Sequence, residues 1–507
     1  MNRLRAPWRT LLLLLAAFAL AGPAQAHVGS KDIFEQVPAG PYQLFITIRP
    51  PDVIPGVAVI EVRTSGSAVS ALSIAPTPLT GEAATHPPSS DAMQRSAADP
   101  AFFTGSLWLM APGSWQVRFL AEGPAGTAHA SVPVPAMPLS ILPMARPLRV
   151  LLAVLGAVLI LGMVGIVAAA VRESRLAPGI SPSSARRRKA ATAAAGTFVL
   201  VAALVVLGGW WWNVEATGYA QALYRPLHLS PTLTGNLLDL RIASEVDRDP
   251  NNQHNQRASR LRSNADLLPD HGHLMHLYAI RQPGMDAVFH LHPSQVAAGD
   301  LRMTLPSMPP GTYKLYSDIV HANGFPETLT AALTVPPDMP PAPLASEDAS
   351  AAPPPLAKGD LGPTYNLPDG YTMVWDRPAN LTANTAYAFR FHLLGPSGKP
   401  AANMQPYLGM AGHAAFVKAD GSTFAHTHPN GSAAMAAVML ANDPSPGEAM
   451  GPGSMCAMNM ASDTAEQIVP TVTFPYGFPS PGRYRIFIQM KHGTTVETGV
   501  FDAEVQP

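Results

Sequence analysis

A short β-hairpin is encoded by the segment His413-Ala-Ala-Phe-Val-Lys-Ala-Asp-Gly-Ser-Thr-Phe-Ala-His-Thr-His-Pro429. Its dipeptide Asp420-Gly421 is a strong signal for a two-residue hairpin turn, because both residues tolerate positive φ angles. Such a turn pairs Ala419 with Ser422, and the pairing of the remaining residues follows by counting outward along both strands. The segment therefore predicts an antiparallel pair of strands with a defined register.

This register brings three histidines to one face of the hairpin. Ala415 falls opposite His426, and His413 falls opposite His428. Directly paired residues share a face of a sheet, as do residues two apart on one strand, so neighbouring Cβ atoms lie roughly 5–7 Å apart. Imidazole is the commonest protein ligand for transition metals. We therefore expect a metal site on this face.

The same arrangement occurs earlier, in a segment that otherwise shares little with the first. It reads His276-Leu-Tyr-Ala-Ile280, a turn, and Phe289-His-Leu-His-Pro293, so His290 and His292 match the later His-Thr-His run. The turn is one residue longer here, and a bulge could restore the same facing of the histidines. A duplicated fold repeats scaffold residues, whereas imidazoles repeated at matching places indicate a duplicated metal site.

Each copy closes on a Pro-Gly-x-Tyr turn signal, with a further histidine ten residues after its glycine. These histidines are His321 and His492, and each could supply a fourth ligand or contact a ligand. Glu327 and Glu497 are the recurring acids within reach of them, either as general bases or as ordinary surface charges.

Sulfur-containing residues accompany the histidines and favour copper. His273 aligns with Met410, and a copper site tolerates this exchange because thioether suits Cu(I) while imidazole suits both oxidation states. The nearby His271 adds a donor. A run from Met455 to Met460, which includes Cys456, is either a soft-metal site or a loop with incidental methionines. Zinc is the alternative metal. The predicted metal ligands are His273, His276, His290, His292, His321, His413, His426, His428, His492 and Met410.

Two apolar stretches, at about 150–171 and 190–212, are each long enough to cross a bilayer as a helix of ~20 residues. The connecting loop, 172–189, is rich in arginine, and the positive-inside rule predicts that it is cytoplasmic. The sequence thus predicts a transmembrane hairpin in the bacterial inner membrane, with the large domains on both sides of it facing the periplasm.

The chain begins like an exported protein. Residues 1–26 combine a basic start, an apolar core and the small-x-small cleavage site Ala24-Gln-Ala26. Cleavage there would leave His27 as an N-terminal amine-plus-imidazole chelator for copper. The single Cys456 excludes an internal disulfide. A formal net charge of −1, without a basic face, gives no reason to expect a nucleic-acid partner.

The remaining sequence is organised as short strands joined by turns, which favours a mainly β fold. We expect three extracytoplasmic immunoglobulin-like β-sandwich domains, at 27–140, 213–336 and 366–507, in addition to the two-helix transmembrane hairpin. A Pro-rich linker, 337–365, separates the last two.

Several segments resemble the YtkA-like family of small exported β-sandwich domains. More distantly, the domains are similar to periplasmic copper-resistance sandwiches of the CopC type, which begin with a histidine. This resemblance implies an exported β-sandwich fold, and it extends to about half of the chain. The segments that carry it are Gly113-Ser-Trp-Gln-Val117, Gly311-Thr-Tyr-Lys-Leu315, Tyr407-Leu-Gly-Met-Ala-Gly-His413, Phe424-Ala-His-Thr-His-Pro429 and Pro481-Gly-Arg-Tyr-Arg485.

Three classes of function remain open, and the first is favoured. In the first class, the chain is a membrane-anchored copper-binding protein that buffers the metal, confers resistance or delivers it to an envelope metalloprotein or oxidase partner. It is alternatively a metalloenzyme with an open coordination position, although Asp286 and Asp420 lie at hairpin turns, away from the histidines. The third class is a metal-independent envelope protein whose sandwiches bind a partner. The oligomeric state is left open.

Overall fold

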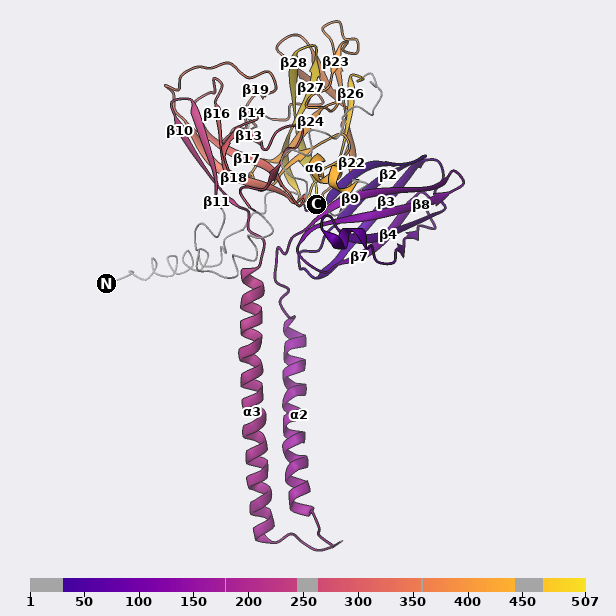
Figure 1. Cartoon of the computed structure of the whole chain (residues 1–507), viewed down its shortest axis with the longest axis vertical. Coiled ribbons are helices and arrows are strands. Elements are labelled where there is room, and N and C mark those ends of the chain that lie inside the picture. The colour runs from indigo at the N-terminus through magenta and orange to yellow at the C-terminus, as the bar shows by residue number, and fades with distance from the viewer. Residues whose placement is uncertain (1–30, 178, 244–262, 357–358, 443–467) are drawn as a thin grey trace, which may run out of the picture.

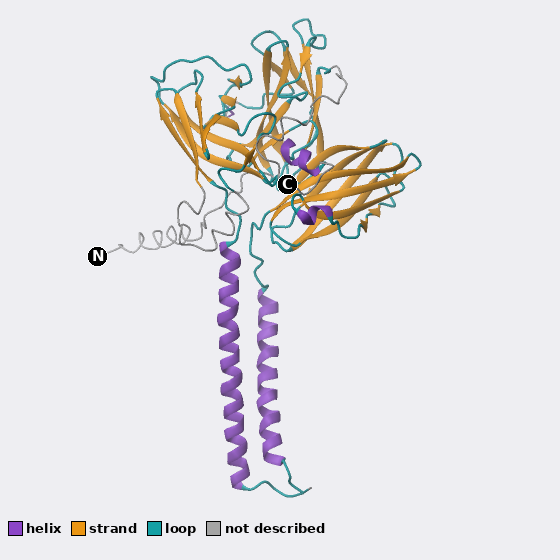
Figure 2. Cartoon of the chain, in the orientation of Figure 1, coloured by secondary structure: helices purple, strands orange, loops and turns teal. Residues whose placement is uncertain are grey.

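The computed structural model describes residues 31–177, 179–243, 263–356, 359–442 and 468–507. Strands make up three soluble units, and the two long helices leave them as a hairpin (Figure 1). Helix is otherwise confined to short pieces (Figure 2). The predicted signal segment 1–26, His27 and the methionine run 455–460 lie outside the described residues.

The N-terminal unit consists of two antiparallel sheets around one apolar core. Strand β3 shows why the sheets pack: Ala58, Ile60 and Val62 are buried, whereas Val57 and Val59 are exposed, as the two-residue period of a strand requires. The first sheet has the order β1 (Ile33–Ala39), β2 (Tyr42–Arg49), β3 (Gly56–Gly66), β7 (Phe102–Leu109), β6 (Gln94–Arg95). The second has the order β5 (Asp91–Ala92), β4 (Ala71–Pro78), β8 (Gly113–Gly123), β9 (Gly126–Ala136), with the short helix η1 (Glu82–Thr85) beside it.

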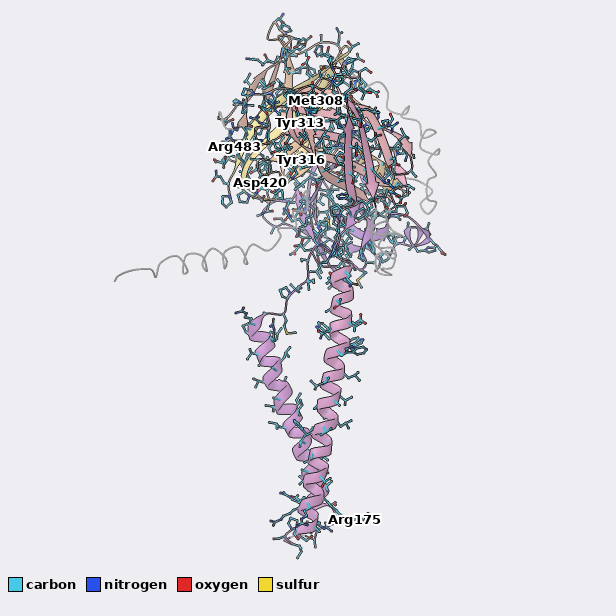
Figure 3. The ribbon with its side chains drawn as sticks, turned by 90° about the vertical axis from the view of Figure 1, so that its left-hand side faces the viewer. Arg175, Met308, Tyr313, Tyr316, Asp420 and Arg483 are labelled. Atoms are coloured by element: carbon cyan, nitrogen blue, oxygen red, sulfur yellow. The ribbon has the colours of Figure 1, made fainter. Side chains whose placement is uncertain are left out.

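The helical hairpin is formed by α2 (Arg146–Glu173) and α3 (Ser184–Gln221). No residue of α2 and only Ala190 of α3 is buried, so two long apolar helices are left without protein around them, which indicates membrane association. Helix α3 begins before the predicted span because the side chain of Ser183 caps it. Part of the predicted loop 172–189 is therefore helical. Arg175 lies at the end of the hairpin farthest from the soluble units (Figure 3).

The middle unit also has two antiparallel sheets that share an apolar core. One has the order β10 (His228–Thr234), β11 (Leu237–Ala243), β16 (Asp300–Thr304), β15 (Ser294–Ala297). The other has the order β12 (Leu267–Leu268), β17 (Gly311–His321), β13 (His276–Arg281), β14 (Val288–Leu291), β19 (Ala349–Ala351), and β18 (Pro326–Val335) pairs with β17.

The C-terminal unit repeats this plan. One sheet has the order β20 (Thr364–Asn366), β21 (Thr372–Trp375), β22 (Tyr387–Leu394), β26 (Thr471–Tyr476). The other has the order β23 (Met404–Gln405), β27 (Gly482–His492), β24 (His413–Lys418), β25 (Phe424–Thr427), and β28 (Thr495–Val505) pairs with β27. The short helix α6 (Met435–Ala441) follows β25.

The middle and C-terminal units pack against each other through the sheets that carry the two histidine hairpins. A separate apolar cluster joins them, with Tyr278 and Tyr316 from one unit and Val417, Phe424 and Phe487 from the other. Strands β13 and β24 are consequently buried on both faces along almost their whole length. Strands of that kind read as continuous apolar runs rather than as alternating patterns.

The predicted linker 337–365 has more structure than a semi-extended spacer. It contains strand β19, which pairs with β14, and the start of β20. Its backbone is also fixed by the C-terminal unit, because Arg485 donates a hydrogen bond to the carbonyl oxygen of Pro354 at 2.8 Å. The segment is therefore part of the contact between the two units.

Candidate metal centre

The predicted register of the later hairpin is confirmed, but its turn is longer than the two residues expected, because Gly421 donates a backbone hydrogen bond to Lys418 and Lys418 donates one to Thr423. Ala415 pairs with His426, and Val417 pairs with Phe424. In the earlier hairpin Leu277 pairs with Leu291, which is the same register. The extra residue lies in the turn, where Arg281 donates a backbone hydrogen bond to Ala287, and no bulge interrupts the paired strands.

The two histidine faces meet across the contact between the units and form one group of side chains. The ring centroid of His426 lies 5.3 Å from that of His276 and 5.4 Å from that of His290. The ring of His271 lies 5.0 Å from His413 and 4.7 Å from His428. This packing brings the two predicted sites into contact with each other. We call the group the histidine cluster; it comprises His271, His273, His276, His290, His292, His413, His426 and His428.

Two sets of three histidines within the cluster could each hold a metal ion. The middle triad, His276, His290 and His292, offers one nitrogen per ring, all within 4.8 Å of one another. The second set, which we call the shared triad, consists of His271 from the middle unit and His413 and His428 from the C-terminal unit. It also offers one nitrogen per ring, all within 4.8 Å of one another.

His426 lies between the two triads. Its ring centroid is 4.8 Å from that of His428 in the shared triad, as well as close to His276 in the middle triad. The sequence had placed His426 in a set with His413 and His428, and the structure puts His271 in that set in its place.

His271 belongs to the shared triad but is absent from the metal ligands predicted from the sequence. It occupies a tight turn in which His271 has a φ of 50° and Gly272 a φ of 86°. Leu408 and Gly409 have nearly the same angles, 49° and 80°, in the matching turn of the C-terminal unit. Two successive positive φ angles are typical of a type I′ turn, and the residue-Gly pair in both copies was a usable signal for it. The turn projects His271 toward the neighbouring unit.

Many ring nitrogens of the cluster lack a hydrogen-bond partner among the described residues. His413 and His428 have none at either nitrogen, and His271, His292 and His426 have none at Nε2. A buried polar atom without a partner costs about 1–3 kcal/mol, so native structures rarely gather several in one place. The chemistry of this donor set fits a transition metal, which accepts the nitrogen lone pairs.

Hydrogen bonds orient the rings of the middle triad. His276 Nε2 lies 3.0 Å from the carbonyl oxygen of Asp270, and His292 Nδ1 lies 3.0 Å from a carboxylate oxygen of Asp348. His290 Nδ1 lies 2.8 Å from the side-chain oxygen of Gln489, a residue of the other unit. Such contacts set the tautomer and aim the opposite nitrogen at a metal.

The contacts across the interface are reciprocal. Gln489 pairs with His413 in the C-terminal sheet, and Asp318 pairs with His276 in the middle sheet, so the two occupy matching places. Gln489 contacts His290 of the middle unit, and Asp318 in turn lies 3.4 Å from Nδ1 of His426. The cluster therefore has approximate twofold symmetry, which duplication of the unit explains.

Burial favours the neutral form of several histidines in the cluster. Loss of contact with water lowers the pKa of His276, His290, His413 and His428 well below 6.5, and repulsion between neighbouring imidazoles lowers it further. The pKa of His271 is also lowered, again chiefly by burial. Because only neutral imidazole coordinates a metal, these rings are competent ligands at neutral pH.

The structure places His321 and His492 in two other groups. His321 Nδ1 lies 2.8 Å from Asp266 and its Nε2 lies 2.9 Å from Glu327, so both nitrogens are engaged. Among the described residues, His321 belongs to none of the sets that could hold a metal ion. His492 Nε2 lies 3.0 Å from Glu497, and with Asp369 these two residues form a third set that could hold one. The recurring acids are thus partners of these histidines.

His273 and Met410 occupy structurally equivalent positions in the two repeats. His273 forms paired backbone hydrogen bonds with Asp270, and Met410 forms the same pair with Tyr407. The ring of His273 lies 4.2 Å from that of His292, at the edge of the middle triad. Met410 is partly buried, and Tyr407, at the start of its turn, lies 5.1 Å from His413.

Comparison with known proteins gives a match to one family over part of the chain and no activity. Residues 239–337 and 365–507, from the middle and C-terminal units, match the profile of a family described as a domain of unknown function (DUF8832). No curated protein matches the sequence.

Similarities to solved structures are weak. An engineered protein is 16% identical with a TM-score of 0.15, over 19% of this chain and 21% of that one. Salmonella alpha-2-macroglobulin reacted with methylamine is 9% identical with a TM-score of 0.20, over 93% and 24%. The ICAM-5 D1–D4 ectodomain fragment is 9% identical with a TM-score of 0.15, over 92% and 77%. The chain thus spans less than a quarter of the length of the first two, and scores this low show no common fold.

Proposed function

We propose that this protein is a membrane-anchored, extracytoplasmic copper-binding protein that holds its ions in the histidine cluster. The observation that carries the proposal is the set of buried ring nitrogens without partners at His271, His292, His413, His426 and His428. Hydrogen bonding among the described residues leaves them unsatisfied, and a metal ion in each triad would satisfy one nitrogen each of His271, His292, His413 and His428.

Copper is favoured over zinc by the donors. Imidazole accepts both metals, but the Irving–Williams order gives Cu(II) the higher affinity at nitrogen sites. Met410 stands where the other repeat has His273, and a thioether adds affinity for Cu(I) and little for Zn(II). Zinc remains the alternative.

The direction of the hairpin supports an extracytoplasmic location. The three soluble units lie at one end of the helices, and the arginine-rich turn with Arg175 lies at the other (Figures 1 and 3). Arginine-rich loops are retained on the cytoplasmic side, so the units would face the periplasm. The resemblance to exported YtkA-like and copper-resistance sandwiches agrees with a role in buffering copper or delivering it to an envelope protein.

Metal analysis of the full chain in detergent tests this proposal. After loading with Cu(II) or Zn(II) and removal of free metal, mass spectrometry should find copper retained in preference to zinc, up to one ion per triad. His413→Ala and His290→Ala should each lower the retained copper. His228→Ala, an exposed histidine of the middle unit, is the matched control and should retain as much as the parent. Equal retention by all four proteins would refute binding at the cluster.

A further inference from the structure

We infer that metal ions reach the histidine cluster through a cavity whose outer wall is supplied by the N-terminal unit. The inference rests on the proposed function, because it assigns the route by which the proposed ions enter and leave. It also gives a role to the unit that lies outside the matched family profile.

Four of the eight rings in the cluster are closed to solvent, and the other four are partly buried. His276, His290 and His413 are at most 1% exposed, and His428 is 3% exposed. A buried metal site needs a path by which the ion enters.

One cavity reaches the cluster. It has a volume of about 140 Å³, and His276, His426 and His428 line it. A water molecule needs about 10–15 Å³ measured in this way, so the cavity has room for a cation with several of its waters. His428 belongs to the shared triad and His276 to the middle triad, and His426 lies between them. An ion in the cavity therefore meets ligands of both sites.

The polar lining of the cavity suits a cation. The carboxylates of Asp270 and Asp318 line it beside the histidines, and Lys31 is the basic residue in the same wall. Acidic groups in a confined, poorly solvated space raise the local concentration of cations.

The N-terminal unit forms part of the cavity wall. Trp115, Pro135 and Met137 belong to its lining, together with residues of the loop that leads into α6. The same unit is fastened to the loop that follows His428. Gln36 donates a backbone hydrogen bond to Asn430 at 2.6 Å.

Two further contacts strengthen this attachment. Ser432 donates a backbone hydrogen bond to Phe34 at 2.9 Å, and a carboxyl oxygen of Glu35 accepts one from the backbone of Ala433 at 2.7 Å. The cavity is thus bounded by a wall that is tied to a ligand-bearing loop.

The test compares rates and affinities in the full chain. Ala434 lines the cavity and is not a metal ligand, so the larger side chain of Ala434→Phe would block the cavity. Met439→Phe, in helix α6, which begins directly after Ala434, but outside the lining, is the matched control. Trp115→Ala would widen the cavity. Uptake of Cu(II) and its release to an excess of chelator are followed by stopped-flow absorbance, and the affinity at equilibrium is measured separately.

Ala434→Phe should slow both uptake and release by about tenfold or more, because a gated path limits association, and the affinity should stay unchanged. Trp115→Ala should accelerate both uptake and release. This second variant keeps the test decisive if Ala434→Phe fails to fold. Parent rates in Ala434→Phe and Trp115→Ala would overturn the route while leaving the proposed function intact. A parent chain that retains no metal would refute the proposed function itself.

Discussion

The middle and C-terminal units carry the same hairpin in the same register, yet they hold their histidines differently. Every ring of the middle triad has one nitrogen fixed by a carbonyl, amide or carboxylate oxygen. Among the described residues, His413 and His428 have no hydrogen-bond partner at either nitrogen. The repeated sequence pattern thus produced two triads with different surroundings.

The difference separates a preorganised site from an adaptable one. Rings that are already oriented lose less conformational freedom when an ion binds, so the middle triad should hold its ion more tightly. The unanchored rings of the shared triad can adjust, and His428 also borders the cavity. We expect the shared triad to exchange its ion and the middle triad to retain it.

Removal of a ligand should have the largest effect. His428→Ala should weaken binding at the shared triad by more than about 100-fold, beyond what the loss of a supporting contact costs. The ion of the middle triad should remain, because His428 is not one of its ligands. Competition titration with a copper chelator measures both affinities. His290→Ala should show the opposite pattern, and loss of both ions in either variant would contradict two distinguishable sites.

The support of the middle triad is tested by Asp348→Asn. The change keeps the shape of the side chain but weakens its hydrogen bond to His292, so affinity at the middle triad should fall about 10–100-fold. The shared triad should be unaffected. The same titration checks this. Asp376→Asn is the control, because Asp376 contacts His392 outside the cluster. An equal effect at both triads would show that the asymmetry does not arise from hydrogen bonding.

His321 allows a test of stability instead of binding. Although burial lowers its pKa, hydrogen bonds to Asp266 and Glu327 outweigh burial and raise that pKa above 6.5. The folded state therefore binds the proton more tightly than the unfolded chain. The resulting stabilisation is fully present below pH 6.5 and is lost as the pH rises through the folded pKa.

His321→Gln should accordingly destabilise the middle unit at acidic pH by about 2 kcal/mol, the scale of a hydrogen bond to a charged group. Thermal unfolding of the full chain across this pH range measures the effect, and the difference from the parent should shrink at high pH. His492→Gln is the matched change in the other repeat, where the side chain is 13% exposed, and its effect should be smaller. Parallel curves for parent and His321→Gln would contradict the assignment.

The smallest effect concerns the metal preference. Met410→Leu should weaken Cu(I) binding a few-fold and leave Zn(II) binding nearly unchanged, because a thioether adds little for zinc. Binding under reducing conditions distinguishes the two metals, and Met439→Leu in α6 controls for the loss of a methionine. Unchanged Cu(I) affinity would remove the sulfur argument and make zinc the better assignment.

Local features of this protein followed from the sequence by itself. Asp420-Gly421 set the register of its hairpin, because turn geometry determines which residues pair. The apolar lengths of α2 and α3 and the short, turn-bounded strands were equally readable. These properties depend on neighbours within a few residues, and a single sequence records such neighbours directly.

The nature of the site was decided by tertiary structure. The contact of His290 with Gln489 joins residues 199 apart, and His271 reaches His413 from another unit. No local rule specifies which faces of two units pack together, since that choice depends on apolar area such as the cluster around Tyr278 and Phe424. Packing of those faces brought the two predicted sites together in one cluster, and His271 takes the place of His426 in the triad with His413 and His428. His321 lies elsewhere, with its two nitrogens in contact with the carboxylates of Asp266 and Glu327.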